Sequence, residues 1–327
     1  MSCASVIWYP KLIAPALLGP VVPLSRAVPC RCDVWTPSGV RVRSRTATSS
    51  CWRCWTACRP KVTGTTANLS TVNWWGRGSV AEQAATAAAY AREWSDSWVD
   101  DTFGGLLQST VECQHCGDKS FRFDACLDLS VPLPSAREAN AKFGPDGIPL
   151  ALCLRKFMEP EVLDVEYKCE GCGNVTSRRK WLQLFTPPRN LVLHLNRFSQ
   201  GGMSDGFGGS PFTGMRKNST AVNVPSKLDM SQCISELGLA AAFSVTGASP
   251  FYKLIAVSEH SGGMGGGHYT ATTRSATDKF WYGFNDSHVS GPSNQAPCGP
   301  SSSAYVLVYK MCTYAVPGGH GSQAPRR

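Results

Sequence analysis

Residues 259–290 of this 327-residue chain read EHSGGMGGGHYTATTRSATDKFWYGFNDSHVS. One β-prone run begins at His268 and a second ends at Asn285, with a polar stretch between them, a pattern that predicts a β-hairpin. A turn centred between Ala276 and Thr277 would place His268 directly opposite Asn285. Cross-strand partners have Cβ atoms roughly 5 Å apart, so the amide could hold one nitrogen of the imidazole ring.

A histidine held in this way is the partner that a nucleophilic cysteine requires. The imidazole takes the thiol proton, and a third group fixes the orientation and tautomer of the ring. Asn285 and Asp286 are both candidates for the third group, and periodicity does not choose between them. The run Gly262–Gly267 has almost no side chains, so an extended peptide could approach His268 closely. The alternative is an exposed hairpin in which these polar residues only lie near a turn.

Four cysteines form two Cys-x-x-Cys-Gly motifs, Cys113 with Cys116 and Cys169 with Cys172. Two pairs of thiolates complete a tetrahedral Zn²⁺ shell without an open position, which predicts a structural zinc site. Each following glycine fits a turn with positive φ that lets backbone N–H groups face the sulfurs. The 52 intervening residues exceed the spacing of a simple zinc ribbon, so each pair is expected to cap a long hairpin arm. The alternative is four buried or free cysteines.

Most of the remaining pattern predicts strands. They are rich in β-branched and aromatic residues and are broken by Gly, Pro or Ser. Because they follow one another without obvious crossover helices, an α+β fold with a mostly antiparallel sheet is expected. Helices are predicted at 81–94 and 150–158, and strands at 103–113, 119–134, 176–184, 191–198, 252–260, 268–274, 279–285 and 304–310.

The net charge of +9 is unevenly distributed along the chain. Residues 1–80 hold ten Lys or Arg and a single acid, Asp33, whereas residues 81–327 hold 22 basic and 22 acidic residues. A neutral body argues against a nucleic-acid surface. No apolar run is long enough to predict a transmembrane helix, so no membrane association is expected. Paired Cys-x-x-Cys motifs in a chain of this length are typical of metal sites in a reducing compartment.

Residues 1–80 also hold six of the 15 Cys and six of the 10 Trp, and they show no clear periodicity. We expect this basic segment to lie outside the packed domain. Three origins are open: an Arg-rich transit peptide, a disordered basic tail, or translation of an out-of-frame or unspliced stretch. The third is favoured because Trp and Cys are scarce in disordered tails.

Five ordered blocks of the chain resemble the ubiquitin-specific protease family, a group of papain-like cysteine proteases. Together with the two cysteine motifs they cover roughly residues 97–310. The blocks are FGGLLQSTVECQHCGDKSFRFDACLDLSVPLP (103–134), YKCEGCGNVTSRRKWLQLFTPPRNLVLHLNRFS (167–199), YKLIAVSEHSGGMGGGHYTATT (252–273), FWYGFNDSHVS (280–290) and AYVLVYK (304–310).

The resemblance implies a hand-like fold with thumb, palm and zinc-bearing fingers, and a deubiquitinating activity. It implies a domain over 81–310, with fingers at 103–185 and palm at 186–310, followed by a tail at 311–327. The four motif cysteines would bind zinc in the fingers, and the fingers would grip the globular part of ubiquitin. His268 would be the general base and Asn285 the third triad member, with Asp286 beside it. The implied partners are ubiquitin and ubiquitinated proteins, in the cytoplasm or nucleus.

The sequence departs from the family at the nucleophile. The family's Cys box, similar to G-x-x-N-x-G-N-T-C-[YF]-x-N-[SA]-x-x-Q, is not found, nor is the second thumb motif, so the thumb is largely missing. The nearest look-alike surrounds Cys51, which lacks the upstream Asn of an oxyanion hole. Cys126, Cys153 and Cys233 lie in strand, helical and loop contexts that do not match either.

Three functions therefore stay open. The first is, by family resemblance, a cysteine-type deubiquitinase that hydrolyses the bond at the C-terminal glycine of ubiquitin; since the thumb and the nucleophile are not found in this chain, the chain itself would then be inactive. The second is a non-catalytic ubiquitin-binding protein, or pseudoenzyme. The third is a zinc-ribbon nucleic-acid binder with a basic arm, which the neutral charge of residues 81–327 disfavours.

Overall fold

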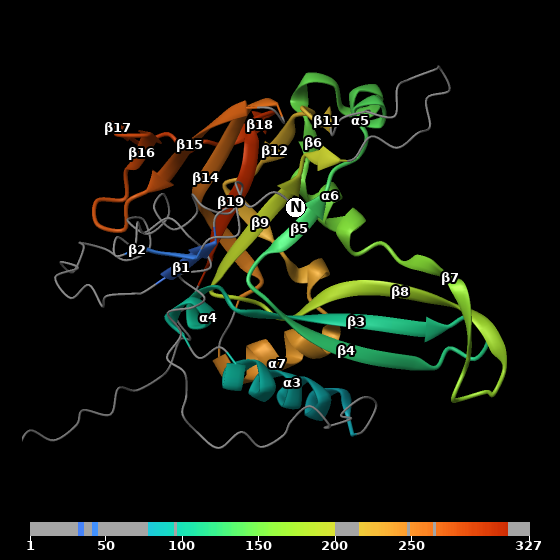
Figure 1. The fold of residues 1–327 in the computed structure, drawn as a ribbon. Coiled ribbons are helices and arrows are strands. Elements are labelled where there is room, and N and C mark those ends of the chain that lie inside the picture. The colour runs from blue at the N-terminus through green and yellow to red at the C-terminus, as the bar shows by residue number, and fades with distance from the viewer. Residues whose placement is uncertain are drawn as a thin grey trace, which may run out of the picture.

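A computed structural model describes residues 32–35, 41–44, 78–94, 97–199, 216–246, 249–263 and 266–312 (Figure 1). The helices are α3 (Val80–Trp94), α4 (Trp98–Phe103), α5 (Ala136–Phe143), α6 (Leu150–Phe157) and α7 (Glu236–Thr246), with 3₁₀ turns at Gly144–Asp146 and Ser231–Cys233. The strands before residue 200 are β1 (Cys32–Trp35), β2 (Arg41–Ser44), β3 (Gly105–Cys113), β4 (Lys119–Cys126), β5 (Leu129–Pro132), β6 (Ile148–Pro149), β7 (Glu161–Lys168), β8 (Val175–Thr186), β9 (Asn190–Asn196) and β10 (Phe198–Ser199). The later strands are β11 (Arg216–Lys217), β12 (Val222–Val224), β13 (Lys227–Asp229), β14 (Phe251–Gly263), β15 (Gly266–Arg274), β16 (Trp281–Asn285), β17 (His288–Ser293), β18 (Gly299–Ser301) and β19 (Ala304–Met311).

An eight-stranded sheet forms the body of the molecule. Its order is β17-β16-β15-β14-β19-β9-β5, with β13 pairing to β14. All these pairs are antiparallel except β5 with β9, which is parallel. The predicted α+β fold with a mostly antiparallel sheet is therefore confirmed.

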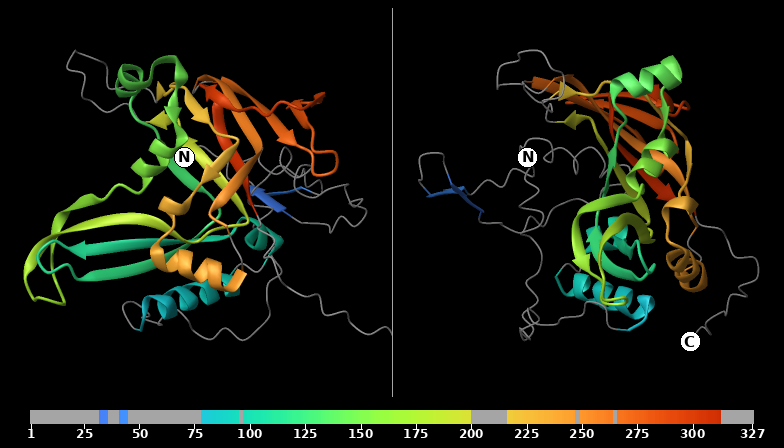
Figure 2. Two further views of the ribbon diagram at one scale, coloured as in Figure 1. Left: turned by 180° about the vertical axis from the view of Figure 1, so that it is seen from behind. Right: turned by 90° about the vertical axis from the view of Figure 1, so that its right-hand side faces the viewer.

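A second sheet forms an arm. Its four antiparallel strands run in the order β4-β3-β8-β7 and extend away from the large sheet (Figures 1 and 2). Helix α3 packs on β4, because Ala84 and Ala87 are small enough to lie against the aromatic pair of Phe123 and Phe185. The ring centroids of that pair are 5.1 Å apart, in edge-to-face geometry.

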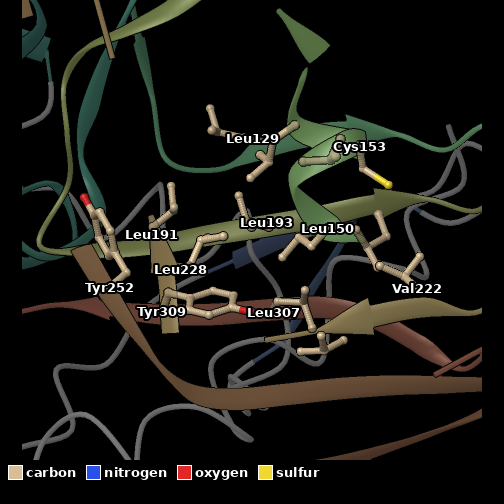
Figure 3. Packing of buried hydrophobic residues seen from close by; sticks show 14 of the residues in the cluster. Leu129, Leu150, Cys153, Leu191, Leu193, Val222, Leu228, Tyr252, Leu307 and Tyr309 are labelled. Carbon is tan, nitrogen blue, oxygen red and sulfur yellow. The ribbon is translucent and has the colours of Figure 1, made fainter. Parts of the chain in front are cut away.

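The main core lies between one face of the large sheet and α6 (Figure 3). Every second residue of β9 faces it, so Leu191, Leu193 and Leu195 are all buried. Each such leucine contributes about 2 kcal/mol of hydrophobic stabilisation. Two tyrosines can be buried here because their hydroxyl groups donate to carbonyls: Tyr252 to Pro188 at 2.7 Å and Tyr309 to Pro225 at 2.9 Å.

Arg197 ties the end of β9 to two distant segments. Its side chain is fully buried and donates to the carbonyls of Asn218, Thr220, Ser301 and Ala304 at 2.6–3.0 Å. Burial lowers the pKa of its guanidinium to about 10, so the group keeps its charge at neutral pH. The four carbonyls replace the water that a buried cation loses.

Most predicted elements are present, including the helix at 81–94 and the helix opened by Pro149. The sequence did not predict α4, α5, α7, β7 and β17, nor the short strands β1, β2, β6, β11, β12, β13 and β18. The start of α5 had a recognisable signal, because Ser135 and Glu138 form a capping box. Strand β7 (EVLDVEYK) is largely exposed, so it lacks the apolar alternation of a half-buried strand.

The described part of residues 1–80 consists of the antiparallel pair β1–β2 and residues 78–80, where α3 begins. Cys51 lies outside the described residues, as do 201–214 and 313–327. Within the described ranges, no helix is both long and apolar enough to cross a membrane.

Candidate active site and metal site

His268 and Asn285 meet on the β15–β16 hairpin. Nε2 of His268 lies 2.5 Å from Oδ1 of Asn285. Because an amide oxygen only accepts, Nε2 carries the proton in this contact, and the lone pair is on Nδ1. The neutral amide therefore fixes both the ring orientation and the tautomer that leaves Nδ1 free to accept a proton.

The predicted register of this hairpin is wrong by two residues. Thr272 pairs with Gly283 and Ala271 with Phe284, so Asn285 continues opposite Thr270 rather than His268. His268 lies two residues along the same face from Thr270, so it is a diagonal neighbour of Asn285. Diagonal pairs are about 7–8 Å apart between Cα atoms, and two side chains of this length span that gap.

The cause of the shift lies in the turn. The N–H of Ser275 donates to the carbonyl of Phe280 at 2.8 Å, so the turn centre falls between Thr277 and Asp278. The carboxylate of Asp278 accepts the N–H of Phe280 at 3.0 Å, and Lys279 has a left-handed φ of 68°. This Asx-type closure moves the turn one residue further along the chain than the polar run alone suggested.

Asp286 occupies the two-residue turn that follows, between Asn285 and His288, which are paired. Its φ of 49° is left-handed, a conformation that Asp adopts more readily than most residues. The imidazole of His268 donates its hydrogen bond to Asn285 and not to Asp286.

The glycines before His268 are needed by the packing of β14 on β15. A Cβ on Gly262, whose φ is 98°, would lie 2.6 Å from the carbonyl oxygen of Gly266. A Cβ on Gly267 would lie 2.1 Å from Nε2 of His260. Residues 264 and 265 lie outside the described residues. The packing of the two strands is therefore enough to explain glycine at these two positions, without the approach of an extended peptide to His268.

Sequence reading assigned no role to His260, yet it is a central buried residue beside the candidate site. Its ring is 4% exposed and packs against Tyr269, Phe198 and Tyr305, with centroids 4.6, 5.4 and 6.0 Å away. The Nζ of Lys217 donates to its carbonyl at 2.5 Å. Burial, and then the charge of Lys217, lower the pKa of His260. Among the described residues, its Nδ1 has no hydrogen-bond partner.

Two further histidines in the large sheet, His194 and His288, form no hydrogen bond with the His268 side chain among the described residues. His194 packs edge-on against Tyr305, with centroids 4.7 Å apart. Burial lowers its pKa, against the opposing charge of Asp128. His288 is exposed on β17.

None of the nine cysteines whose side chains the structure describes forms a hydrogen bond with His268. Burial raises the pKa of Cys126 to about 12, of Cys153 to about 11 and of Cys233 to about 12. These three thiols stay protonated at neutral pH, which suits packing rather than nucleophilic attack. This agrees with their exclusion on sequence context.

The four motif cysteines converge at the end of the arm. Their sulfur atoms all lie within 4.8 Å of one another, and those of Cys116 and Cys169 are 3.7 Å apart. A tetrahedral site with metal–sulfur distances of about 2.3 Å requires sulfurs about 3.8 Å apart. The cluster therefore fits a metal ion held by four thiolates, with no position open for substrate.

Both motifs adopt the same turn. The N–H of the glycine donates to the carbonyl of the first cysteine at 2.9 Å, in Gly117 to Cys113 and in Gly173 to Cys169. The two glycines have φ of 75° and 74°, as predicted. No atom lies within 4 Å of a Cβ added to either, so the φ angle and not the space requires glycine.

Neighbouring groups polarise the cluster. The Thr176 hydroxyl and the backbone N–H groups of Cys116 and His115 lower the pKa of Cys113 to about 6. A backbone hydrogen bond at Asp118 lowers the pKa of Cys116, but burial and the other three thiols outweigh it and raise it to about 12. Thr176 was missed by sequence reading, although it follows the second motif closely and pairs opposite Tyr167.

The comparisons with known proteins agree with this geometry. The family model described as ubiquitin carboxyl-terminal hydrolase matches residues 73–309. Ubiquitin carboxyl-terminal hydrolase 21 of Homo sapiens is 36% identical over 221 residues, 67% of this chain and 34% of that protein. Ubiquitin carboxyl-terminal hydrolase Usp2 of Drosophila melanogaster is 35% identical over 218 residues, 66% of this chain and 20% of that protein. The matched region thus spans about a third or less of these relatives.

Solved structures give the same result. The SAGA Ubp8/Sgf11/Sus1/Sgf73 DUB module bound to ubiquitin aldehyde has a chain with a TM-score of 0.52 and 26% identity, covering 67% of this chain and 43% of that one. A chain of the yeast SAGA DUB module with an Sgf73 Y57A mutant has a TM-score of 0.52 and 27% identity, and the match covers 69% of this chain and 45% of that one. The family match, the relatives and the fold agree: the chain belongs to the ubiquitin-specific protease family of ubiquitin carboxyl-terminal hydrolases.

Proposed function

We propose that the described body of this chain recognises ubiquitin and supplies the general base and its orienting residue for cysteine-dependent deubiquitination. The observation that carries the proposal is the hydrogen bond from Nε2 of His268 to Oδ1 of Asn285. It leaves Nδ1 as the basic nitrogen, and family membership supplies the substrate class. Residues 103–185 would be the fingers and 186–310 the palm of a domain over 81–310.

In this scheme a thiol gives its proton to Nδ1 of His268. The resulting thiolate attacks the carbonyl carbon of the C-terminal glycine of ubiquitin, and the amine of the substrate leaves with the proton from the imidazolium. Water then hydrolyses the thioester, with His268 again acting as base. Asn285 holds the ring throughout, and Asp286 lies in the next turn, where it contributes to the local charge.

The nucleophile is the part that the described residues do not provide. We assign it to a cysteine outside them, since no described cysteine is hydrogen-bonded to His268. The same observation favours a second candidate function, a ubiquitin-binding pseudoenzyme that uses the arm and the palm without hydrolysis.

The four-cysteine cluster would hold a structural Zn²⁺ that fixes the end of the arm. When bound, zinc would cross-link β3–β4 to β7–β8 through Cys113, Cys116, Cys169 and Cys172, and would take no part in the chemistry. Paired zinc-binding cysteines are typical of reducing compartments, which supports the cytoplasm or nucleus as the location of the protein.

Labelling with ubiquitin that bears an electrophile at its C-terminus tests the catalytic pair. Mass spectrometry would map any adduct to one cysteine. If the chain is active, the adduct forms on a cysteine outside the nine described, and His268→Ala slows labelling at least about 100-fold. Asn285→Ala should slow it as well, and His288→Ala, on the neighbouring strand, should not.

No adduct on a folded chain that binds ubiquitin would support the pseudoenzyme. An adduct on a described cysteine, or labelling that is indifferent to His268→Ala, would contradict the assigned roles.

A further inference from the structure

Three lysines lie side by side across adjacent strands at one end of the large sheet. Lys227 on β13 is paired with Lys253 on β14, and Lys253 is paired with Lys310 on β19. Residues paired in this way project to the same face of a sheet, with Cβ atoms about 5 Å apart. All three side chains are exposed. We call them the lysine row.

The row carries more positive charge than its acidic neighbour balances. Among the described residues, none of the three amines forms an ion pair or a hydrogen bond. Asp229, two residues along β13 from Lys227, shares this face and accepts the N–H of Ser231 at 2.8 Å. One carboxylate beside three ammonium groups leaves the surface with a net positive charge. Like charges directly opposite each other destabilise a sheet, so folding alone gives no reason to line up three lysines.

An apolar side chain adjoins the row. Phe251 lies two residues before Lys253 on the same strand and the same face, and it is 41% exposed. The row and Phe251 together present three donors beside one large apolar ring. Such a surface fits a ligand that carries several acceptor groups next to a hydrophobic side chain.

The surface is separate from the candidate active site. The position on β14 that pairs with His268 is Ser261, eight residues from Lys253. At about 3.3 Å per residue, this places the row about 26 Å along the strand from the hairpin pair. Figure 1 shows β14 and β19 running side by side, and their paired residues extend along β14 from Tyr252 to Glu259.

The chain does not itself supply an acidic occupant from its ends. Residues 1–80 hold one acid among ten basic residues, and residues 313–327 hold two arginines and no acid. Nucleic acid is disfavoured, because its binding depends on neutralising several phosphates and this row offers three amines on a body without net charge.

From this geometry we infer that the lysine row and Phe251 form a docking surface for an acidic polypeptide segment of a partner protein, one with Asp or Glu residues around a hydrophobic side chain. The charges select the segment, and Phe251 anchors it. The surface would hold a partner without involving His268.

The test uses the full chain and a fluorescein-labelled twelve-residue peptide of Asp and Glu with one central Phe, followed by anisotropy at low and physiological salt. The amide version of the peptide, with Asn and Gln, should bind at least tenfold more weakly. Lys227→Gln, Lys253→Gln and Lys310→Gln combined should weaken binding roughly tenfold or more. The control variant combines Lys142→Gln, Arg155→Gln and Lys156→Gln and so has the same change in charge. Its affinity for the acidic peptide should stay within about twofold of that of the parent chain.

The variant should remain folded, because the three side chains are exposed and their mutual repulsion is removed. A melting temperature at or above that of the parent chain would show this directly. The inference is overturned if the acidic peptide does not bind at low salt, if both triple variants lose binding equally, or if a single-stranded oligonucleotide of equal charge binds more tightly than the peptide.

Discussion

Replacing Gly267 by alanine should destabilise the hairpin that carries His268. The new Cβ would lie 2.1 Å from Nε2 and 2.8 Å from Cε1 of His260, and 2.8 Å from the carbonyl oxygen of Ser261. The ring of His260 cannot move aside cheaply, because it is 4% exposed and enclosed by three aromatic rings. Inserting a methyl group into packing of this kind costs about 2 kcal/mol. In a domain of this size that lowers Tm by about 4–8 °C.

Gly266→Ala is the matched control. It adds the same methyl group one residue earlier on β15, where no atom lies within 4 Å of the new Cβ. Neither glycine has a positive φ, so backbone strain does not separate the two variants. Gly266→Ala should therefore melt within about 1–2 °C of the parent chain.

A double-mutant cycle identifies the cause. His260→Ala removes the ring that meets the new Cβ but leaves the Ser261 carbonyl, so it should relieve part of the cost. The coupling energy between the two substitutions should be about 1 kcal/mol, measured by thermal or urea denaturation of the four proteins. Additive effects, or equal melting of the Gly266→Ala and Gly267→Ala variants, would refute the packing argument.

Three further predictions concern metal, pH and the buried arginine. The purified chain should contain one zinc per molecule by elemental analysis, and chelation or Cys169→Ser should lower Tm by roughly 10 °C. Burial lowers the pKa of His260 in the folded state, so as the pH drops the unfolded state takes up this proton first. The free energy of unfolding should therefore fall below about pH 6.5. Urea midpoints measured at pH 7.5, 6.5 and 5.5 should show this fall, and His260→Gln should make it smaller. Arg197→Ala leaves four carbonyls without their donor, so it should lower the free energy of unfolding by at least about 3 kcal/mol. Arg189→Ala, at an exposed position, should lower it by less.

Local pattern was enough to predict most of the elements and the metal cluster. The two Cys-x-x-Cys-Gly motifs specify their own turns, and the structure brings all four sulfurs within 4.8 Å. The meeting of His268 with Asn285 was also predictable, since both lie on one hairpin. Its register was not, because the Asp278 side chain closes the turn one residue later than a symmetric reading of the polar run suggests.

Features that depend on distant segments could not be found in this way. Arg197 is buried because carbonyls 21 to 107 residues away converge on it, and nothing next to it in the sequence shows this. The lysine row combines three strands whose register is known only from the folded sheet. His260 looked like a polar residue beside a glycine-rich loop, and its burial follows from aromatic residues on three other strands.

Ubiquitin binding is the most direct test of the central claim, because under the proposed function it would depend on the arm and the large sheet and not on the nucleophile. Unmodified ubiquitin, labelled with ¹⁵N, would be titrated with the zinc-loaded chain and followed by NMR. We predict saturable binding of one ubiquitin per chain, with shifts in the C-terminal tail of ubiquitin as well as its globular part. A folded, zinc-loaded chain that leaves the ubiquitin spectrum unchanged at high micromolar concentration would contradict the account.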